Sequence, residues 1–144
     1  MLGTEGVAAR VYWQVLSEQL PPSWRFNGRS RRPAKDNFNA ALNYLFGMLY
    51  NTVEQACLAA GLDPMLGYLH VDDYLKTTFV FDAIEPFRPW VEILLVQKIL
   101  TTPNQSSFFT KKKEGIFLNK KGRKFYISEF NNFMNHSIII DRKN

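Results

Sequence analysis

The stretch DNFNAALNYLFGMLYNTVEQACLAAG, residues 36–61, decides the fold of this chain. Asp36 is a favourable N-cap because a carboxylate can accept hydrogen bonds from the free amides of a first helical turn, and Gly61 suits the position just past a helix end. Between them, apolar side chains recur at helical spacing, which predicts a long helix at the centre of the core. They are Phe38, Leu42, Leu45, Phe46, Leu49, Val53, Ala56 and Cys57.

Three polar side chains interrupt the N-terminal half of this predicted helix: Asn39, Asn43 and Tyr44. They are candidates to line an active site. For the asparagines, the alternative is a set of buried hydrogen bonds between helices, since buried amides need partners. For Tyr44, the alternative is a core position with its hydroxyl at the edge.

Working outward, helical spacing of apolar side chains predicts three further helices. The first ends at a Pro-Pro pair, the second begins at an Asp-Pro pair, and the third ends before Pro103, because proline starts helices well and continues them badly. They cover residues 4–19, 63–70 and 90–100.

The C-terminal part predicts less regular structure. Residues 104–114 are polar and basic, which favours a mobile segment within a basic region 104–144, and residues 116–127 read as a small hairpin turning at 119–122. Ser128 then caps a helix through Met134. The predicted fold class is mainly α, a multi-helix domain with this one hairpin.

Length and composition predict a single globular domain over residues 1–144, of which 46% are hydrophobic. The one cysteine, Cys57, cannot form an intramolecular disulfide and is most simply a small buried apolar residue. Glu5 and Arg10 interrupt any N-terminal signal peptide, and charges interrupt the later apolar run at 91–100. We therefore expect a soluble, cytoplasmic protein.

The net charge of +5 is unevenly distributed. Residues 1–100 hold nine Lys or Arg against ten Asp or Glu, whereas residues 101–144 hold nine against three. This asymmetry indicates a polyanion as partner, with nucleic-acid phosphates as the simplest choice. A solvated loop is the alternative. The C-terminal candidates for DNA contact are Lys111, Lys112, Lys113, Lys120, Lys121, Arg123 and Lys124.

A second basic cluster lies in residues 24–35, where Gly, Ser and Pro favour a loop. Its arginines can pair with phosphates, and the interleaved Trp24 and Phe26 can stack on bases. Alternatively, one or two of the arginines pair with groups inside the protein. The candidates are Arg25, Arg29, Arg31 and Arg32.

Four separated side chains are candidates for a metal site: Glu5, His70, Asp82 and Glu85. Carboxylates with one imidazole suit Mg²⁺ or Mn²⁺ better than Ca²⁺. Each also has a plainer role, since Glu5 favours a helix N-terminus, Asp82 and Glu85 have the spacing of a surface pair, and a lone histidine is usually structural.

The sequence around these residues resembles the helical catalytic domain of the CRISPR-associated integrase, the Cas protein that inserts new spacers during adaptation. Weaker similarity continues through residues 115–118 and 122–124. The resemblance rests on EGVAARVYW (5–13), NGRSRRP (27–33) with Asp36 and Asn39, GLDPMLGYLH (61–70) and DAIEPFRPW (82–90).

The resemblance implies that Glu5, His70 and Glu85 match the family's catalytic metal ligands. Asp82 matches a nearby acidic residue, and whether it binds the metal directly stays open. It also implies a helix over residues 77–85, whose composition alone is strand-like. Arg88, three residues after Glu85, pairs with a site carboxylate or with a DNA phosphate; both readings stay open.

The implied chemistry is metal-dependent DNA cleavage and strand joining. A divalent ion would polarise a phosphodiester and orient the attacking hydroxyl. With a DNA 3′-hydroxyl as nucleophile the result is spacer integration by transesterification, and with water it is cleavage. A ligating His70 must be neutral, so activity is expected to fall at acid pH.

The family's members also carry an N-terminal β-rich domain for dimerisation and for docking the small second protein of the adaptation complex. This chain begins almost at the Glu5 helix, which implies that the β-rich domain is absent from it. Implied partners are spacer-precursor, repeat and branched DNA, the second protein and a second copy. The alternative function is a catalytically idle nucleic-acid-binding fragment.

Overall fold

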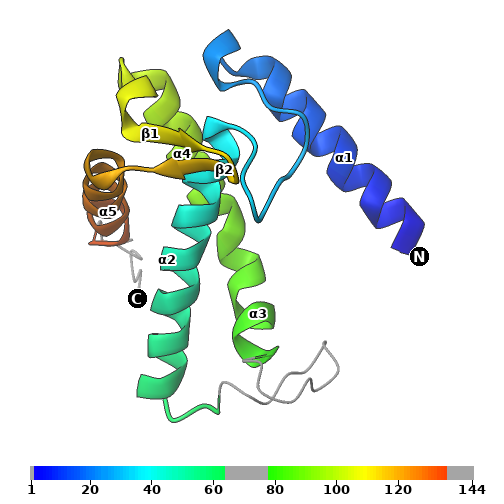
Figure 1. The fold of residues 1–144 in the computed structure, drawn as a ribbon. Helices are drawn as coiled ribbons and strands as arrows, with labels where there is room; N and C mark the ends of the chain where they lie inside the picture. Colours follow the sequence, from blue (N-terminus) through cyan, green and yellow to red (C-terminus); the bar gives the residue numbers. More distant parts are fainter. Residues whose placement is uncertain (1, 64–77, 136–144) are drawn as a thin grey trace, which may run out of the picture.

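The computed structural model describes residues 2–63 and 78–135. Within these ranges the chain is mainly helical, with one antiparallel hairpin, so the predicted fold class is confirmed (Figure 1). Helix α2 lies in the middle, with α3 and α4 along one side and α5 on the other. The elements are α1 (Leu2–Gln19), η1 (Pro22–Trp24), α2 (Asn37–Ala59), α3 (Thr78–Ile84), η2 (Glu85–Phe87), α4 (Arg88–Thr101), η3 (Gln105–Phe108), β1 (Phe109–Lys112), β2 (Gly115–Leu118) and α5 (Lys120–Asn135).

Helix α2 begins and ends where its sequence predicts. The Asp36 carboxylate accepts a hydrogen bond from the Asn39 amide at 2.7 Å. At the other end Gly61 has φ +74°, and the amides of Gly61 and Leu62 donate back to the carbonyls of Leu58 and Cys57. This closure stops the helix cleanly, because glycine adopts the left-handed conformation without a Cβ clash.

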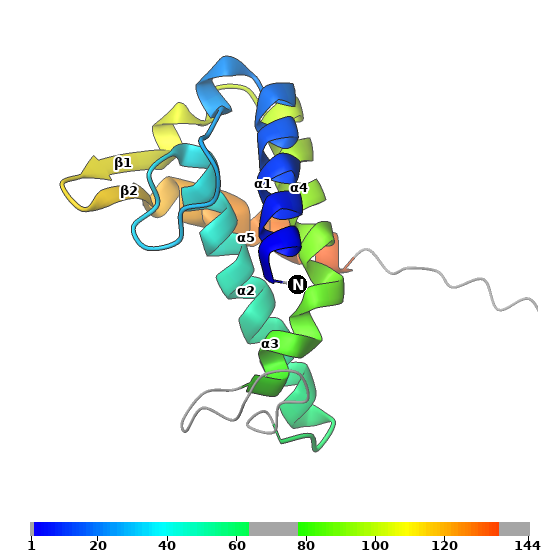
Figure 2. The ribbon, with the colours of Figure 1, turned by 90° about the vertical axis from the view of Figure 1, so that its right-hand side faces the viewer.

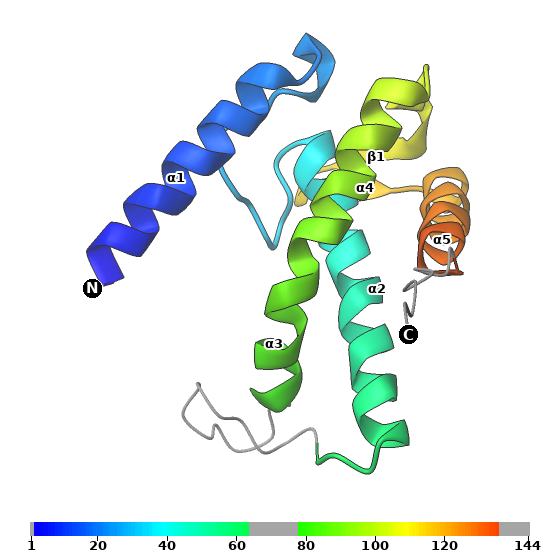
Figure 3. The same cartoon turned by 180° about the vertical axis from the view of Figure 1, so that it is seen from behind.

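Helices α3 and α4 follow one another as a broken rod beside α2, as Figure 3 shows. Pro86 and Pro89 have no amide hydrogen to continue an α-helical ladder, so the chain passes through the 3-10 turn η2 between them. The helix implied by the resemblance over residues 77–85 is confirmed at Thr78–Ile84. Val80 and Leu95 are completely buried on either side of the break.

The hairpin exists but lies elsewhere than predicted. Strand β2 is Gly115–Leu118, and it pairs with β1, so the expected mobile segment 104–114 instead supplies η3 and a strand. The prediction of strands and a turn over 116–127 was wrong beyond Leu118, because Asn119 caps a helix: its Oδ1 accepts from the Gly122 amide at 3.0 Å. Helix α5 therefore begins at Lys120, not at a Ser128 cap.

The core is built by α2 and closed by α4 and α5. Phe38, Leu42 and Leu45 of α2 are completely buried, as is Tyr126 of α5. The Tyr126 hydroxyl donates to Gln105 Oε1 at 2.8 Å, and Gln105 Nε2 donates to the Lys98 carbonyl at the end of α4. One polar chain thus connects α5, η3 and α4 inside an apolar core, and burial raises the pKa of Tyr126.

Helix α1 contrasts with the rest, because only its C-terminal half packs. Ser17 and Leu20 are buried, and Ser17 Oγ bonds both the amide and the carbonyl of Phe26. Val11 and Val15, which predicted an apolar face, are exposed. In Figures 1 and 3 the N-terminal end of α1 stands clear of the other helices, and Figure 2 shows α1 on the α4 side of the molecule.

Candidate nucleic-acid interface and metal ligands

Glu85 lies at the break between α3 and α4, the first residue of η2. Its side chain is 57% exposed, and Arg88 donates to its Oε1 at 2.6 Å. Arg88 also lies over the Phe46 ring, 4.9 Å from the centroid. Of the two readings for Arg88, pairing with the carboxylate is the one seen. Asp82 lies one turn earlier on α3 and is half-buried.

The other predicted metal ligands cannot be placed beside Glu85. Glu5 belongs to α1, but its side chain, His70 and the predicted helix 63–70 beyond Asp63 lie outside the described residues. Within the described part, no three His, Cys, Asp or Glu side chains lie together as a metal site. The exposed carboxylate of Glu85, with Asp82 three residues before it, is compatible with an Mg²⁺ or Mn²⁺ site, since these ions take oxygen ligands.

The loop before α2 carries one arginine that turns inward. Arg29 is half-buried, and its guanidinium lies 5.3 Å from the Trp13 ring and 5.6 Å from the Phe46 ring. Nη1 donates to Asn39 Oδ1, and Nη2 donates to Asn43 Oδ1 at 2.9 Å. Burial, with the nearby charges of Arg31 and Arg88, lowers the pKa of Arg29 to about 10, so it stays charged at neutral pH. Its contacts make Arg29 a bridge between α1 and α2.

The two asparagines of α2 hold this loop in place. Asn39 is completely buried, and its Nδ2 donates to the Gly28 carbonyl at 3.0 Å while its Oδ1 accepts from the Ser30 amide. Asn43 Nδ2 donates to the carbonyls of Ser30 and Arg31 at 2.9 and 2.7 Å. The bonds join a helix to a loop, so the expected helix–helix bonds are not what these amides make.

Trp24 and Phe26 do not form a stacking surface for bases. Both are buried, and the Phe26 ring stacks on Phe38 at 4.1 Å. Trp24 meets Phe109 of β1 edge-on. The sequence cannot distinguish these two buried aromatics from exposed ones, because the short turn η1 and the loop after it have no helical or strand periodicity that would identify a buried face.

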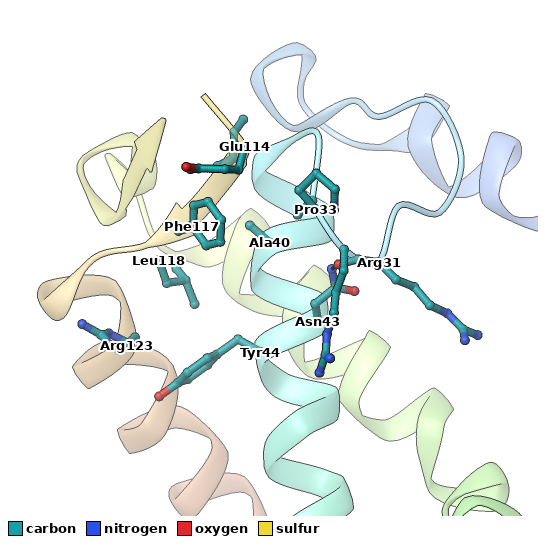
Figure 4. Close-up of a pocket in the computed structure, with 12 residues that line it drawn as sticks. Arg31, Pro33, Ala40, Asn43, Tyr44, Glu114, Phe117, Leu118 and Arg123 are labelled. Atoms are coloured by element: carbon teal, nitrogen blue, oxygen red, sulfur yellow. Dashed lines mark hydrogen bonds between the residues drawn. The ribbon is translucent and has the colours of Figure 1, made fainter. Parts of the chain in front are cut away.

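Arg31 and Arg32 turn outward and line a pocket of about 640 Å³ between the loop, α2 and the hairpin (Figure 4). Asn43 and Tyr44 of α2 also line it, so two of the three predicted site-lining residues do meet a cavity, whereas Asn39 serves the loop. Sequence reasoning missed the hairpin's contribution. The full lining is Arg31, Arg32, Pro33, Ala34, Ala40, Asn43, Tyr44, Glu114, Ile116, Phe117, Leu118 and Arg123.

The C-terminal cations lie on the hairpin and on α5, two elements that border the same pocket, and one of them, Arg123, lines it. Lys111 and Lys112 lie on β1, Lys113 follows in the turn, and the other four lie in the first two turns of α5. All seven are exposed. Lys112 lies over the Phe117 ring and Lys121 over the Phe108 ring. The fold therefore brings together two basic clusters that are far apart in sequence. Arg25, also exposed, follows η1 at the start of the same loop.

No helix in the described ranges has the length and apolar character needed to cross a membrane.

Fold and surface together define a class: a mainly helical domain with many exposed cations, three of which, Arg31, Arg32 and Arg123, line one pocket. The family described as CRISPR associated protein Cas1 matches residues 1–132. This chain belongs to the Cas1 family, as the sequence resemblance implied. It is 42% identical over 112 residues to CRISPR-associated endonuclease Cas1 2 of Saccharolobus solfataricus, a match that covers 78% of this chain and 34% of that relative.

Solved structures give the same fold. A casposase bound to integration product superimposes with a TM-score of 0.83 and 30% identity, covering 93% of this chain and 39% of the casposase chain. A chain of a Cas6-RT-Cas1–Cas2 complex gives a TM-score of 0.86 and 26% identity, covering 96% of this chain and 16% of that chain. This chain thus spans well under half the length of these relatives.

Proposed function

We propose that this chain is the catalytic domain of a metal-dependent DNA endonuclease and integrase, which joins new spacers to a CRISPR array. The observation that carries the proposal is the match to the Cas1 family over residues 1–132, and the same domain carries the exposed Glu85 carboxylate and a set of exposed cations. The name of the Saccharolobus relative supports nuclease chemistry, and the casposase bound to integration product supports strand joining.

In this proposal Glu5, His70 and Glu85 hold one Mg²⁺ or Mn²⁺ ion, with Asp82 nearby. When bound, the ion would stabilise charge on the phosphodiester and lower the pKa of an attacking hydroxyl. The chain's own part is positioning. Arg88 orients the Glu85 carboxylate through a charge-assisted bond of 2.6 Å. Arg31 and Arg32, exposed on a loop fixed by Asn39 and Asn43, hold DNA phosphates.

Partners follow from the same relatives. The Cas6-RT-Cas1–Cas2 complex supports a small Cas2-type second protein as partner. A second copy of this chain is the further partner that the family resemblance implies. DNA substrates are spacer precursors, the CRISPR repeat and branched DNA.

The test is Mn²⁺-dependent cleavage and strand transfer on branched DNA, measured together with Mn²⁺ binding by titration. We expect Glu85→Ala, Glu5→Ala and His70→Ala each to lower turnover at least about 100-fold, as loss of charge stabilisation at a reacting group does. Glu18→Gln, an exposed carboxylate at the far end of α1, is the matched control and should leave turnover unchanged.

A second candidate function is a catalytically idle DNA-binding fragment. It is favoured by the exposed cations of the loop, the hairpin and α5, which suit DNA binding without any metal site. Salt-sensitive DNA binding with neither Mn²⁺ binding nor turnover, even after a longer Cas1 relative is added, would establish this second function and refute the enzyme proposal.

A further inference from the structure

The pocket of about 640 Å³ between α2, the loop 31–34 and the hairpin is unassigned by the chemistry above. Its volume falls in the range of about 300–1,000 Å³ that small-molecule sites occupy. Figure 4 shows Tyr44 extending from α2 toward the first turns of α5, below Phe117 and Leu118 of β2. Two aromatic rings from different elements thus border one space.

Phe117 is an aromatic side chain that folding leaves exposed. It is 42% exposed on β2, while its neighbours Ile116 and Leu118 are half-buried. Lys112 lies 5.7 Å from its ring centroid. An aromatic face within a cationic surface suits a ligand that carries both a flat ring and negative charge, because the ring stacks and the cations neutralise the charge.

Arginines supply the charge recognition. Arg31, Arg32 and Arg123 all line the pocket, all are exposed, and within the described residues none of them forms an ion pair. Glu114 is the one acidic residue of the lining, and in Figure 4 it lies at the hairpin tip, at the opposite end from Tyr44 and Arg123. A phosphate is therefore favoured at the Arg123 end.

The pocket walls are fixed before any ligand arrives. The Ile116 amide donates to the Ala34 carbonyl at 2.9 Å, which docks the hairpin against the loop. Asn43 holds the Arg31 carbonyl from the other side at 2.7 Å. Gly115 permits the close approach, since a Cβ there would lie 2.6 Å from Pro33 Cβ. A preformed site loses little entropy on binding.

We propose that this pocket binds one unpaired nucleotide, its base between Phe117 and Tyr44 and its phosphate toward Arg123 and Arg32. The inference rests on the proposed function only in taking DNA as the source of that nucleotide. A stacked, paired base cannot enter a concave site without leaving its helix, so the ligand is a single-stranded arm of DNA; a free nucleotide shares the same chemistry.

The test compares Phe117→Ala with Ile127→Ala, since Ile127 is 40% exposed on α5 outside the pocket. Fluorescence anisotropy measures binding of a duplex with a single-stranded arm and of the same duplex made blunt, both in EDTA so that no metal site contributes. We expect Phe117→Ala to weaken binding of the armed duplex about 5- to 100-fold and to leave the blunt duplex within about twofold.

The charge recognition has its own matched pair. Arg123→Gln should weaken binding of the armed duplex more than Lys124→Gln, which removes the same charge from an exposed neighbour outside the pocket lining. As an independent readout, 5-iodouracil placed in the arm should photo-crosslink to Phe117 or Tyr44. Equal binding by Phe117→Ala and Ile127→Ala, with crosslinks elsewhere, would overturn the proposal.

Titration with dAMP separates the two sources. Saturable dAMP binding that Phe117→Ala abolishes supports the site and extends it to free nucleotides, whereas an effect on the armed duplex alone assigns it to DNA strands. These binding measurements need no metal. If the unsubstituted chain shows no Mn²⁺-dependent cleavage but Phe117→Ala still weakens binding of the armed duplex, the proposed enzyme function is refuted and this inference stands.

Discussion

Arg29 and its neighbours Arg31 and Arg32 belong to one short basic segment, yet the fold uses them in opposite ways. Arg29 lies between two aromatic rings and donates to two asparagines, whereas Arg31 and Arg32 point into solvent at a pocket. The difference is set by α2, whose Asn39 and Asn43 capture the backbone on both sides of Ser30. Charge in a sequence therefore indicates function only where the backbone leaves the side chain free.

The largest expected effect on stability comes from removing the Asn39 side chain, which holds the loop before α2 in place. Asn39→Ala leaves the Ser30 amide, the Gly28 carbonyl and Arg29 without their buried partner. This loss should lower the free energy of unfolding by about 2–4 kcal/mol. Urea denaturation measures it. Asn51→Ala, an exposed position on the same helix, should change little, and equal midpoints for the two variants would contradict this account.

The close contact between the hairpin at Gly115 and the loop at Ala34 should contribute nearly as much to stability. Gly115 has φ +156°, and a Cβ there would lie 2.7 Å from the Ala34 carbonyl oxygen. Gly115→Ala should therefore cost about 1–3 kcal/mol of stability. Hydrogen exchange of the Ile116 amide should accelerate at the same time.

Gly47→Ala is the control for that variant. A Cβ at this mid-helix position meets nothing within 4 Å. The substitution should stabilise the chain by about 0.5–1 kcal/mol, because alanine loses less backbone entropy in a helix than glycine. Equal destabilisation by the two alanines would remove the special role of Gly115.

A conservative change sharpens the comparison itself. Arg29→Lys keeps the charge but loses the planar fork and the ring contacts. The loss should cost about 2 kcal/mol in thermal or urea unfolding. Arg31→Lys, made at the outward position, should stay within about 0.5 kcal/mol of the parent chain, as exposed substitutions usually do. Reversal of this order would show that the inward and outward assignments are wrong.

The smallest effect is in salt dependence. Arg31→Gln and Arg32→Gln should leave unfolding unchanged and each reduce the slope of log K against log salt for duplex DNA by about 0.9, the value for one phosphate contact. Anisotropy titrations across a salt series provide the measurement. A slope that does not change would place both arginines off the DNA path.

Much of the helical frame was predictable because its signals are local. Asp36 and Gly61 predict both ends of α2, and prolines predict where α1 and α4 end. The helix at Thr78–Ile84 was predicted from the family resemblance, although its composition is strand-like. Composition misleads here because packing against α2, a tertiary contact, outweighs the local β-propensity.

The hairpin and the pocket were beyond local reasoning. Asn119 and Gly122 have the composition of a turn, but Gly122 is inside α5, where a Cβ would lie 2.5 Å from the Phe108 carbonyl oxygen. Such a close approach is a tertiary fact. Of the predicted metal ligands, Glu85 and Asp82 are placed on one side of α2, while convergence with Glu5 and His70 stays a prediction.

The bond between the Ile116 amide and the Ala34 carbonyl uses main-chain atoms only. Side chains at either residue can therefore drift over evolutionary time without undocking the hairpin, provided that neither a proline at 116 nor a bulkier residue at 115 intervenes. The residues of the hairpin and the loop that border the pocket can therefore be substituted one at a time, and the pocket can change its specificity more easily than the buried face of α2 can change its packing.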